Sequence, residues 1–305
     1  MSAQVWPPIS DEDRIVKEEE SLAAELQWLL SHLQSALTSL KSGLLECLAL
    51  LSPPEPTPTT LALSSLRSES VKGFVTRVGA RIVKGDIQLR LPTLPPPSRG
   101  QPSYPLRLTS ELALPQLSHL LECLNQALDI IDVSRWTGDP QDGGFIASQL
   151  KLLSDTIAEA RATLKGGDDV KGCLWYEDVP DEGMFEPPLH PLLAPHLSIC
   201  DAALVLHIRT LAHPPVLSSQ GTDPLGSFTG LSIRTRLGLA ARPQVHDELD
   251  QVFEWRGQEV SVREKVRVES QDPSLMAVMA KLSALGHSVE GWRLKVNVVR
   301  GEEVD

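Results

Sequence analysis

Six side chains with metal-binding or nucleophilic chemistry lie between residues 190 and 213. They are His190, His196, Cys200, Asp201, His207 and His213. Imidazole nitrogens and thiolates bind transition metals, and a cysteine beside a histidine forms an activated nucleophile. A hydrolase or metal-dependent enzyme is therefore one hypothesis. Because prolines flank the group and its members lack the spacing of a ligand pair, ordinary strand and loop histidines are the preferred interpretation.

A second pair consists of His119 and Cys123, four residues apart on a predicted helix. This spacing places both side chains on one face and supplies half of a zinc site. A structural zinc ion needs four ligands, and the sequence shows no second pair. We therefore interpret the pair as a surface histidine beside a buried cysteine, and predict no metal and no cofactor.

Other chemical signatures are absent from the sequence. The glycine-rich stretch Gly221–Gly230 lacks both the Lys-Ser/Thr of a P-loop and the GxGxxG order that holds phosphate. Paired carboxylates occur throughout the acidic chain, but nothing selects one pair for acid–base catalysis. We predict no catalytic residues.

The final residues offer an interaction motif. Glu302, Glu303, Val304 and Asp305 end the sequence, and they are similar to chaperone tails whose carboxylates are held by TPR domains. Two interpretations remain: a tail that binds a TPR protein, or a chance product of an acidic chain, which we favour.

Composition limits the class of protein. The 305 residues allow about two domains, and 41% apolar residues suffice for a core. The net charge of −12 opposes binding to nucleic acid or anionic lipid. No apolar run reaches the roughly 18 residues of a membrane span. Four scattered cysteines and an acidic N-terminus predict a reduced, cytoplasmic protein.

Leucine spacing predicts the helices that must position these groups. Ser10 and Asp13 form a capping box, and leucines at steps of three or four continue from Leu22 to Leu51, where Ser52-Pro53-Pro54 ends the helix. The same spacing returns over 117–131 and 146–164.

The C-terminal helix carries the most specific pattern. Asp272 is the predicted cap, and Pro273 is the first helical residue. A heptad seam follows, which requires a partner helix along its length. Its members are Leu275, Val278, Leu282, Leu285, Val289 and Trp292, continued by Val296 and Val299. Since neither this seam nor that of the first helix can stay exposed, we expect the two helices to pack within one chain.

Alternating patterns predict strands between the helices. Residues 71–91 form a predicted hairpin that turns at Lys84-Gly85-Asp86, residues 197–211 favour strands, and 252–268 form a valine-rich hairpin around Arg256-Gly257. Stretches rich in proline, glycine or acidic residues are predicted linkers or loops. These are 52–68, 92–105, 168–195 and 213–250.

The order of these elements resembles the Rogdi family. The resemblance rests on the leucine-rich first helix, Val71-Lys72-Gly73, Asp86-Ile87-Gln88-Leu89-Arg90-Leu91-Pro92, Phe253-Glu254-Trp255 and the terminal heptad helix. It implies an α+β protein with a discontinuous antiparallel helical bundle and a smaller antiparallel β domain. The implied bundle comprises 10–52, 109–166 and 273–300, and the implied β domain comprises 70–92 and 197–270.

The resemblance also implies a function without catalytic residues. The family includes the second subunit of the fungal RAVE complex, which acts with a large WD-repeat subunit to reassemble the peripheral sector of the vacuolar proton ATPase onto its membrane sector. It implies a cytoplasmic adaptor recruited peripherally to vacuolar or endosomal membranes. A generic coiled-coil tether that dimerises through its last helix is a further alternative.

Overall fold

The structure is a computed structural model that describes residues 10–55, 57–65, 69–94, 103–135, 143–166, 174–213, 246–249 and 251–301. Its contacts divide the chain into two compact units. We call the first the helical unit, which comprises the described residues of Met1–Leu51, His119–Ala162 and Ala277–Asp305. We call the second the β unit, which comprises those of Ser52–Ser118 and Thr163–Met276. Helices and two antiparallel sheets make this a mixed fold.

Helix α1 (Asp11–Leu51) begins and ends where the sequence predicts. Ser10 Oγ accepts a hydrogen bond from Asp13 N at 3.1 Å and donates one to the Asp13 carboxylate at 2.7 Å. These bonds satisfy an amide that has no partner within the helix, and the acidic first turn complements the helix dipole. The helix stops at Leu51 because two prolines follow at 53 and 54.

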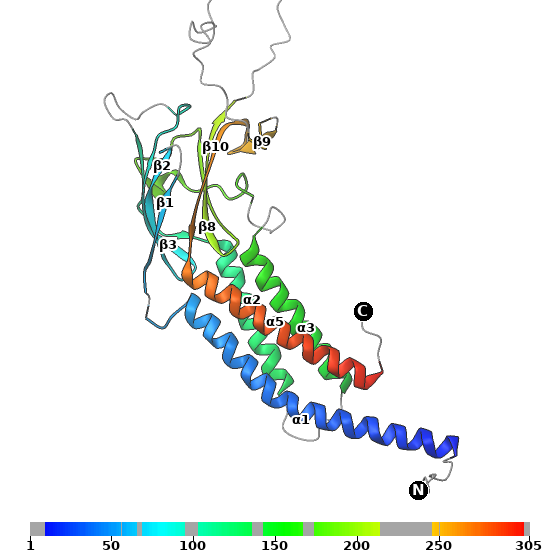
Figure 1. Cartoon of the computed structure of the whole chain (residues 1–305). Coiled ribbons are helices and arrows are strands. Elements are labelled where there is room, and N and C mark those ends of the chain that lie inside the picture. Colours follow the sequence, from blue (N-terminus) through cyan, green and yellow to red (C-terminus); the bar gives the residue numbers. More distant parts are fainter. Residues whose placement is uncertain are drawn as a thin grey trace, which may run out of the picture. The chain divides into compact units, whose positions relative to one another are not determined.

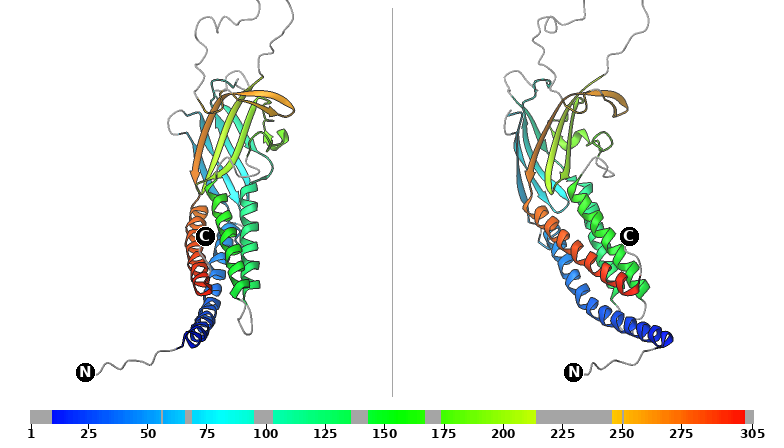
Figure 2. Two further views of the ribbon diagram at one scale, coloured as in Figure 1. Left: turned by 90° about the vertical axis from the view of Figure 1, so that its right-hand side faces the viewer. Right: turned by 45° about the vertical axis from the view of Figure 1, so that its right-hand side comes forward.

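Three further helices run beside α1 in the helical unit (Figures 1 and 2). They are α2 (Pro115–Ser134), α3 (Gly143–Lys165) and α5 (Pro273–Arg300). The first and last helices pack within one chain, as expected: Lys281 Nζ of α5 donates to Glu46 of α1 at 2.5 Å. A Cβ atom added at Gly43 would lie 2.7 Å from Leu285 Cδ2, so the glycine permits this close approach.

The apolar face of each helix forms the core of the helical unit. Leucines at positions 29, 30, 33, 37, 40 and 44 of α1 are buried. On α5 within this unit, Val278, Leu282, Val289 and Val296 are fully buried, whereas Leu285 and Trp292 are half-buried; Leu275, also fully buried, belongs to the β unit. Charged side chains at the margins join neighbouring helices, as Lys41 of α1 does with Asp132 of α2 at 2.5 Å. None of the described helices is both long enough and apolar enough to cross a membrane.

Two antiparallel sheets form the β unit. The first joins its strands in the order β1-β2-β3-β4-β6, with β5 also paired to β3, and the second has the order β7-β8-β10-β9. The strands of the first are β1 (Thr59–Ser64), β2 (Val71–Val78), β3 (Arg81–Leu89), β4 (Tyr104–Leu108), β5 (Leu112–Ala113) and β6 (Phe185–Glu186). Those of the second are β7 (Leu193–Cys200), β8 (Ala203–Ala212), β9 (Val252–Trp255) and β10 (Gln258–Gln271). A short 3-10 helix, η1 (Glu182–Met184), precedes β6.

The hairpins follow the predicted pairing, with one correction. Strands β9 and β10 turn at Arg256-Gly257, where both residues have positive φ as this tight turn requires. Strands β2 and β3 turn at Gly79 and Ala80 instead of Lys84-Gly85-Asp86. A register shift between Thr76 and Arg77 explains the error, because an irregularity in pairing breaks the alternating pattern inside β3.

Three predicted linkers are wrong in part. The stretch 52–68 contains β1, 92–105 ends in the first residues of β4, and 168–195 contains η1, β6 and the start of β7. Proline content misled the prediction for 52–68, because the prolines at 53, 54, 56 and 58 precede β1 and none lies within it. The part of the chain assigned to the bundle from residue 109 first forms β5, and α2 begins at Pro115, two residues before the predicted helical spacing starts at Leu117. Residues 214–245, most of the fourth predicted linker, lie outside the described residues.

Strand β8 explains why 197–211 has no clear alternation. Nearly all its residues are buried on both faces, since one face meets the first sheet and the other is covered by residues 174–176 together with Asp247, Glu248, Gln251 and Phe253. A strand buried on both sides reads as a continuous apolar run. The preference for strands over a helix in this region is confirmed.

Candidate functional site

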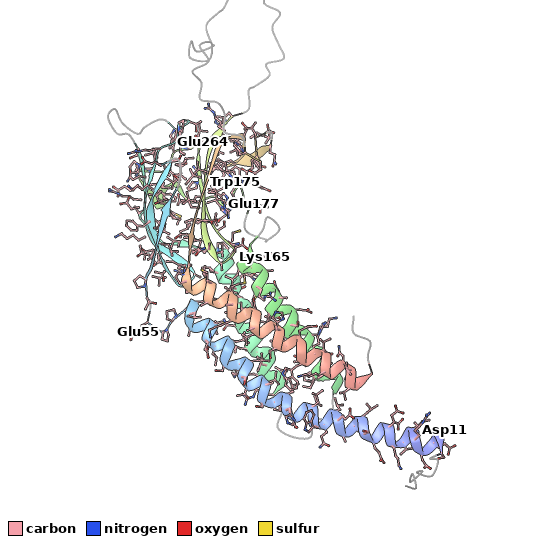
Figure 3. The ribbon with its side chains drawn as sticks, viewed as in Figure 1. Asp11, Glu55, Lys165, Trp175, Glu177 and Glu264 are labelled. Atoms are coloured by element: carbon pink, nitrogen blue, oxygen red, sulfur yellow. The ribbon has the colours of Figure 1, made fainter. Side chains whose placement is uncertain are left out.

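A cavity of about 380 Å³ lies on the face of the second sheet turned away from the first. On β7, His196, Ser198 and Cys200 alternate toward it, and on β8 so do His207 and Arg209. Antiparallel pairing sets this arrangement, because His196 lies opposite His207 and directly paired residues share a face. Trp175, labelled in Figure 3, forms part of the opposite wall.

Buried charges line this cavity. The Arg209 guanidinium donates two hydrogen bonds of 2.8 Å to the Glu248 carboxylate and stacks 4.8 Å from the centroid of the Trp175 ring. Lys265 Nζ also contacts Glu248, at 2.7 Å, and Asp247 at 2.8 Å. The two positive charges of Arg209 and Lys265 are therefore neutralised by the two carboxylates of Asp247 and Glu248. Within the described residues, Arg209 Nη1 is buried without a hydrogen-bond partner.

The two histidines of the cavity are neutral at physiological pH. Burial, with the positive charge of Arg209 next in importance, lowers the pKa of His196 to about 4. Burial together with Arg209 and Lys265 lowers the pKa of His207 to about 3. A protonated imidazole would face two cations in a desolvated site. Neither histidine is therefore suited to accept a proton as a general base near neutral pH.

The rest of the predicted cluster does not assemble. Cys200 pairs with Ala203 at the far end of the β7–β8 hairpin, four strand positions from His207, so this strand-paired histidine cannot activate its thiol. Asp201 occupies the tight turn with φ of 49°. His190 Nδ1 accepts a hydrogen bond from Leu192 N, and His213 is exposed after β8. The geometry gives no support to the hydrolase hypothesis.

Glu159 joins the predicted pair of His119 and Cys123. His119 Nε2 lies 3.7 Å from Cys123 Sγ on α2 and 3.0 Å from Glu159 Oε1 on α3. The three ligand atoms lie within 4.8 Å of one another, and within the described part of the chain this is the one such group that could hold a metal ion. Burial and the nearby carboxylates of Glu159 and Glu122 raise the pKa of Cys123 to about 11, so its thiol is protonated in the metal-free protein.

A buried ion pair fixes the start of α5 in the β unit. Arg77 Nε on β2 donates to Asp272 Oδ2 at 2.7 Å, and both side chains are almost fully buried. Asp272 Oδ1 accepts from Ser274 N at 3.0 Å, as an N-cap does. Burial raises the pKa of Asp272, but the hydrogen bonds from Arg77 and Ser274 outweigh it, and the pKa lies below its usual value. The predicted cap is present, with a charged partner that sequence reasoning missed.

The first turns of α1 form an exposed acidic and apolar surface, which we call the α1 tip and define as residues 11–25. Ile15 and Leu22 are 51% and 43% exposed, yet they continue the stripe on which Leu29 and Leu33 are buried. The tip carries seven acidic and two basic side chains. Figure 3 shows Asp11 at the N-terminal end of α1. A Cβ added at Gly143 would meet Leu26, so the cover given by α3 begins beyond the tip.

Several of these residues have no signal in the sequence. Glu159 is one of many acidic residues on exposed helix faces, and its position beside His119 depends on how α2 and α3 pack. Arg209 and Glu248 lie 39 positions apart. The predicted tail Glu302, Glu303, Val304 and Asp305 lies outside the described residues.

Comparison with known proteins identifies the family. A family model described as Rogdi leucine zipper containing protein matches residues 25–297, which is most of the chain. The chain belongs to this family. The predicted Rogdi resemblance is confirmed, and the match includes α2, α3 and nearly all of α5.

A fission yeast protein extends the comparison. Regulator of V-ATPase in vacuolar membrane protein 2 from Schizosaccharomyces pombe is 25% identical over 272 residues, which cover 81% of this chain and 83% of the relative. This relative is named as a regulator rather than as an enzyme. The similarity therefore involves most of both chains and is not confined to one helix.

Proposed function

We propose that this protein is a non-catalytic adaptor subunit of a RAVE-like complex. It promotes assembly of the peripheral sector of the vacuolar proton ATPase onto the membrane sector. The observation that carries the proposal is the similarity to the yeast regulator of V-ATPase over most of both chains, within a shared family. The neutral, buried histidines of the cavity support a role without acid–base chemistry.

The adaptor works through protein surfaces, and the α1 tip is the one we assign to a partner. Its stripe of Ile15 and Leu22 continues a packed seam and is exposed in the part of the chain that the structure describes. The negative charge of the tip selects a partner surface that is apolar with basic side chains around it, and disfavours a second copy of the same acidic tip. A large WD-repeat subunit and peripheral-sector subunits are the partners in this proposal.

The helices that carry the tip form an antiparallel bundle domain in this proposal, separate from a β domain. The seam of α5, with Leu275, Val278, Leu282, Leu285, Val289 and Trp292, holds α5 in the bundle. Because α5 packs on α1 of the same chain, its seam is not available to a second chain. This packing supports an adaptor over a tether that dimerises through α5. Glu302, Glu303, Val304 and Asp305 offer a TPR protein a separate site, and the adaptor is recruited peripherally to vacuolar or endosomal membranes from the cytoplasm.

Removal of the protein from its native cells tests the function. We expect the peripheral sector to remain in the cytosol, and vacuolar acidification to weaken, while the amounts of ATPase subunits stay unchanged. Fractionation of membranes and a ratiometric pH dye measure these effects. Normal sector assembly in cells without the protein would contradict the proposal.

A pair of matched variants tests the surface. Leu22→Asp adds a charge to the apolar stripe of the tip, and Ala24→Asp adds the same charge to the opposite, exposed side of α1. Partner recovery by affinity capture from native cells should fall in Leu22→Asp and persist in Ala24→Asp. If both variants recover equal amounts of partner, the α1 tip is not the partner-binding surface, and the adaptor role itself is not contradicted.

A further inference from the structure

Helices α2 and α3 bring together a set of potential metal ligands. His119 and Cys123 lie one turn apart on α2, and Glu159 faces them from α3. His119 Nε2 lies 3.7 Å from Cys123 Sγ and 3.0 Å from Glu159 Oε1. A thiol, an imidazole and a carboxylate therefore converge without any movement of the backbone.

These distances match the geometry of zinc. With Zn–N bonds of about 2.0–2.1 Å and Zn–S bonds of about 2.3 Å, the ligand atoms of a tetrahedral site lie about 3.3–3.7 Å apart. The two observed separations lie within a few tenths of an ångström of this range, and the third, between Cys123 Sγ and Glu159, is at most 4.8 Å. Thiolate and imidazole ligands select zinc over magnesium or calcium, which prefer oxygen ligands only.

The surroundings of His119 add a second, independent observation. Its other ring nitrogen, Nδ1, lies 3.8 Å from a carboxylate oxygen of Glu122, which is an ion-pair distance rather than a hydrogen bond. Metal-binding histidines commonly present the second nitrogen to a carboxylate, which orients the ring and leaves Nε2 available for the metal. Nε2 of His119 is the nitrogen that faces Cys123 and Glu159. Nε2 is thus the nitrogen placed for binding, and the carboxylate of Glu122 lies near enough to attract the Nδ1–H of a zinc-bound His119.

We propose that His119, Cys123 and Glu159 bind a zinc ion that joins α2 to α3. Binding forms one bond each to sulfur, nitrogen and oxygen, and the thiol of Cys123 releases its proton to solvent. His119 and Glu159 are about half exposed, so the fourth coordination position is open to water. Because the ion contacts the folded helix pair, it stabilises the helical unit. This inference does not depend on the adaptor role.

Cobalt and zinc binding to the purified full-length protein tests the site. The protein is first treated with a chelator under reducing conditions and then titrated with Co²⁺ alone, followed by Zn²⁺. We expect one equivalent of cobalt with a thiolate-to-metal charge-transfer band, displacement of the cobalt by zinc, and a higher melting temperature in zinc. No charge-transfer band, or no binding at a 1:1 ratio, would overturn the proposal.

Variants identify the ligands. Cys123→Ser should abolish the charge-transfer band and the zinc-dependent rise in melting temperature, and Glu122→Gln should weaken zinc binding about tenfold. Cys47→Ser, on another buried cysteine, and His287→Asn, on an exposed helical histidine, are the controls and should bind cobalt as the unmodified protein does. Circular dichroism confirms folding of each. If Cys123→Ser does not fold, Glu159→Gln is the decisive variant, because its side chain is exposed, and unchanged affinity in it would refute the site.

Discussion

The helical unit and the β unit are stabilised by different kinds of interaction. In the helical unit, the buried positions of α1 and α5 are mostly leucine and valine, and the ion pairs Lys41–Asp132 and Lys281–Glu46 lie at its partly exposed margins. In the β unit, charged side chains are buried, as in the pairs Arg77–Asp272 and Arg209–Glu248. Apolar contacts depend little on pH, whereas a buried charge is stable only with its partner. The two units should therefore fail under different perturbations.

The largest effect is expected from a charge in the helical core. Leu282 is fully buried, so Leu282→Ala should lower the free energy of unfolding by roughly 2–5 kcal/mol. Leu282→Asp should lower it further, because the carboxylate would lack a partner. Leu294→Asp on the same helix is the control, since Leu294 is 39% exposed. Urea unfolding followed by circular dichroism measures both, and a stable Leu282→Asp protein would refute a core along α5.

Glu290 does not serve as a neutral position on α5. Glu290 lies outside the seam formed by Leu275, Val278, Leu282, Leu285, Val289 and Trp292, and a position off a seam is expected to tolerate change. In the structure it accepts hydrogen bonds from Ser154 Oγ at 3.3 Å and from Arg293 at 3.0 Å. Its position at the junction with α3 explains the difference, because helix faces that are off one seam can meet a third helix.

The next largest effect concerns the buried ion pair of the β unit. Asp272→Ala leaves Arg77 buried without its carboxylate and also removes the cap of α5, so it should cost about 3–5 kcal/mol. Asp272→Asn combined with Arg77→Met keeps a capping oxygen and removes both charges. This double variant should recover most of the loss. If the free energy of unfolding of the double variant is no higher than that of Asp272→Ala in the same urea assay, the charge pair itself is required.

Acid should weaken the β unit before the helical unit. The low pKa values of His196 and His207, about 4 and 3, mean that the unfolded chain binds protons first as the pH falls below about 6.5. Stability is therefore full above that pH and decreases below it, by roughly 2–4 kcal/mol between pH 7 and pH 5 for both groups together.

Protonation of carboxylates adds to this loss at lower pH. Asp272 has a lowered pKa, so its contribution is present above the unfolded value and is lost as the pH falls through the folded one. Hydrogen exchange read by mass spectrometry at pH 7, 6 and 5, corrected for intrinsic rates, measures each unit separately. Protection should decrease first in β7, β8 and β10. Equal loss in α1 and α5 would contradict the contrast between the units.

The smallest effect on stability is expected at the α1 tip. Leu22 is 43% exposed, so Leu22→Asp should change the free energy of unfolding by less than about 0.5 kcal/mol. The same variant is expected to lose partner binding, and the combination separates a binding role from a structural one. A loss of stability as large as that of Leu282→Ala would show that the tip is covered within the chain.

Much of the fold follows from local patterns in the sequence. Ser10, Asp272 and Pro273 mark helix starts through backbone hydrogen bonding that involves only neighbouring residues. The leucine stripe of α1 gives its length, since a 3.6-residue repeat defines one face whatever covers that face. The hairpin at Arg256-Gly257 is equally local. These features depend on residues a few positions apart, and reasoning from the sequence finds them.

Tertiary structure decided which distant residues meet. The sequence shows His119 and Cys123 as half of a site, but only the packing of α3 on α2 brings Glu159 to within 3.0 Å of the histidine. The alternation of β7 and β8 does not reveal that Arg209 and Glu248 neutralise each other in a buried cavity. Ile15 and Leu29 follow the same repeat, yet one is exposed and the other buried. The reason is physical: a side-chain pattern specifies a face, and only the neighbouring elements determine what that face contacts.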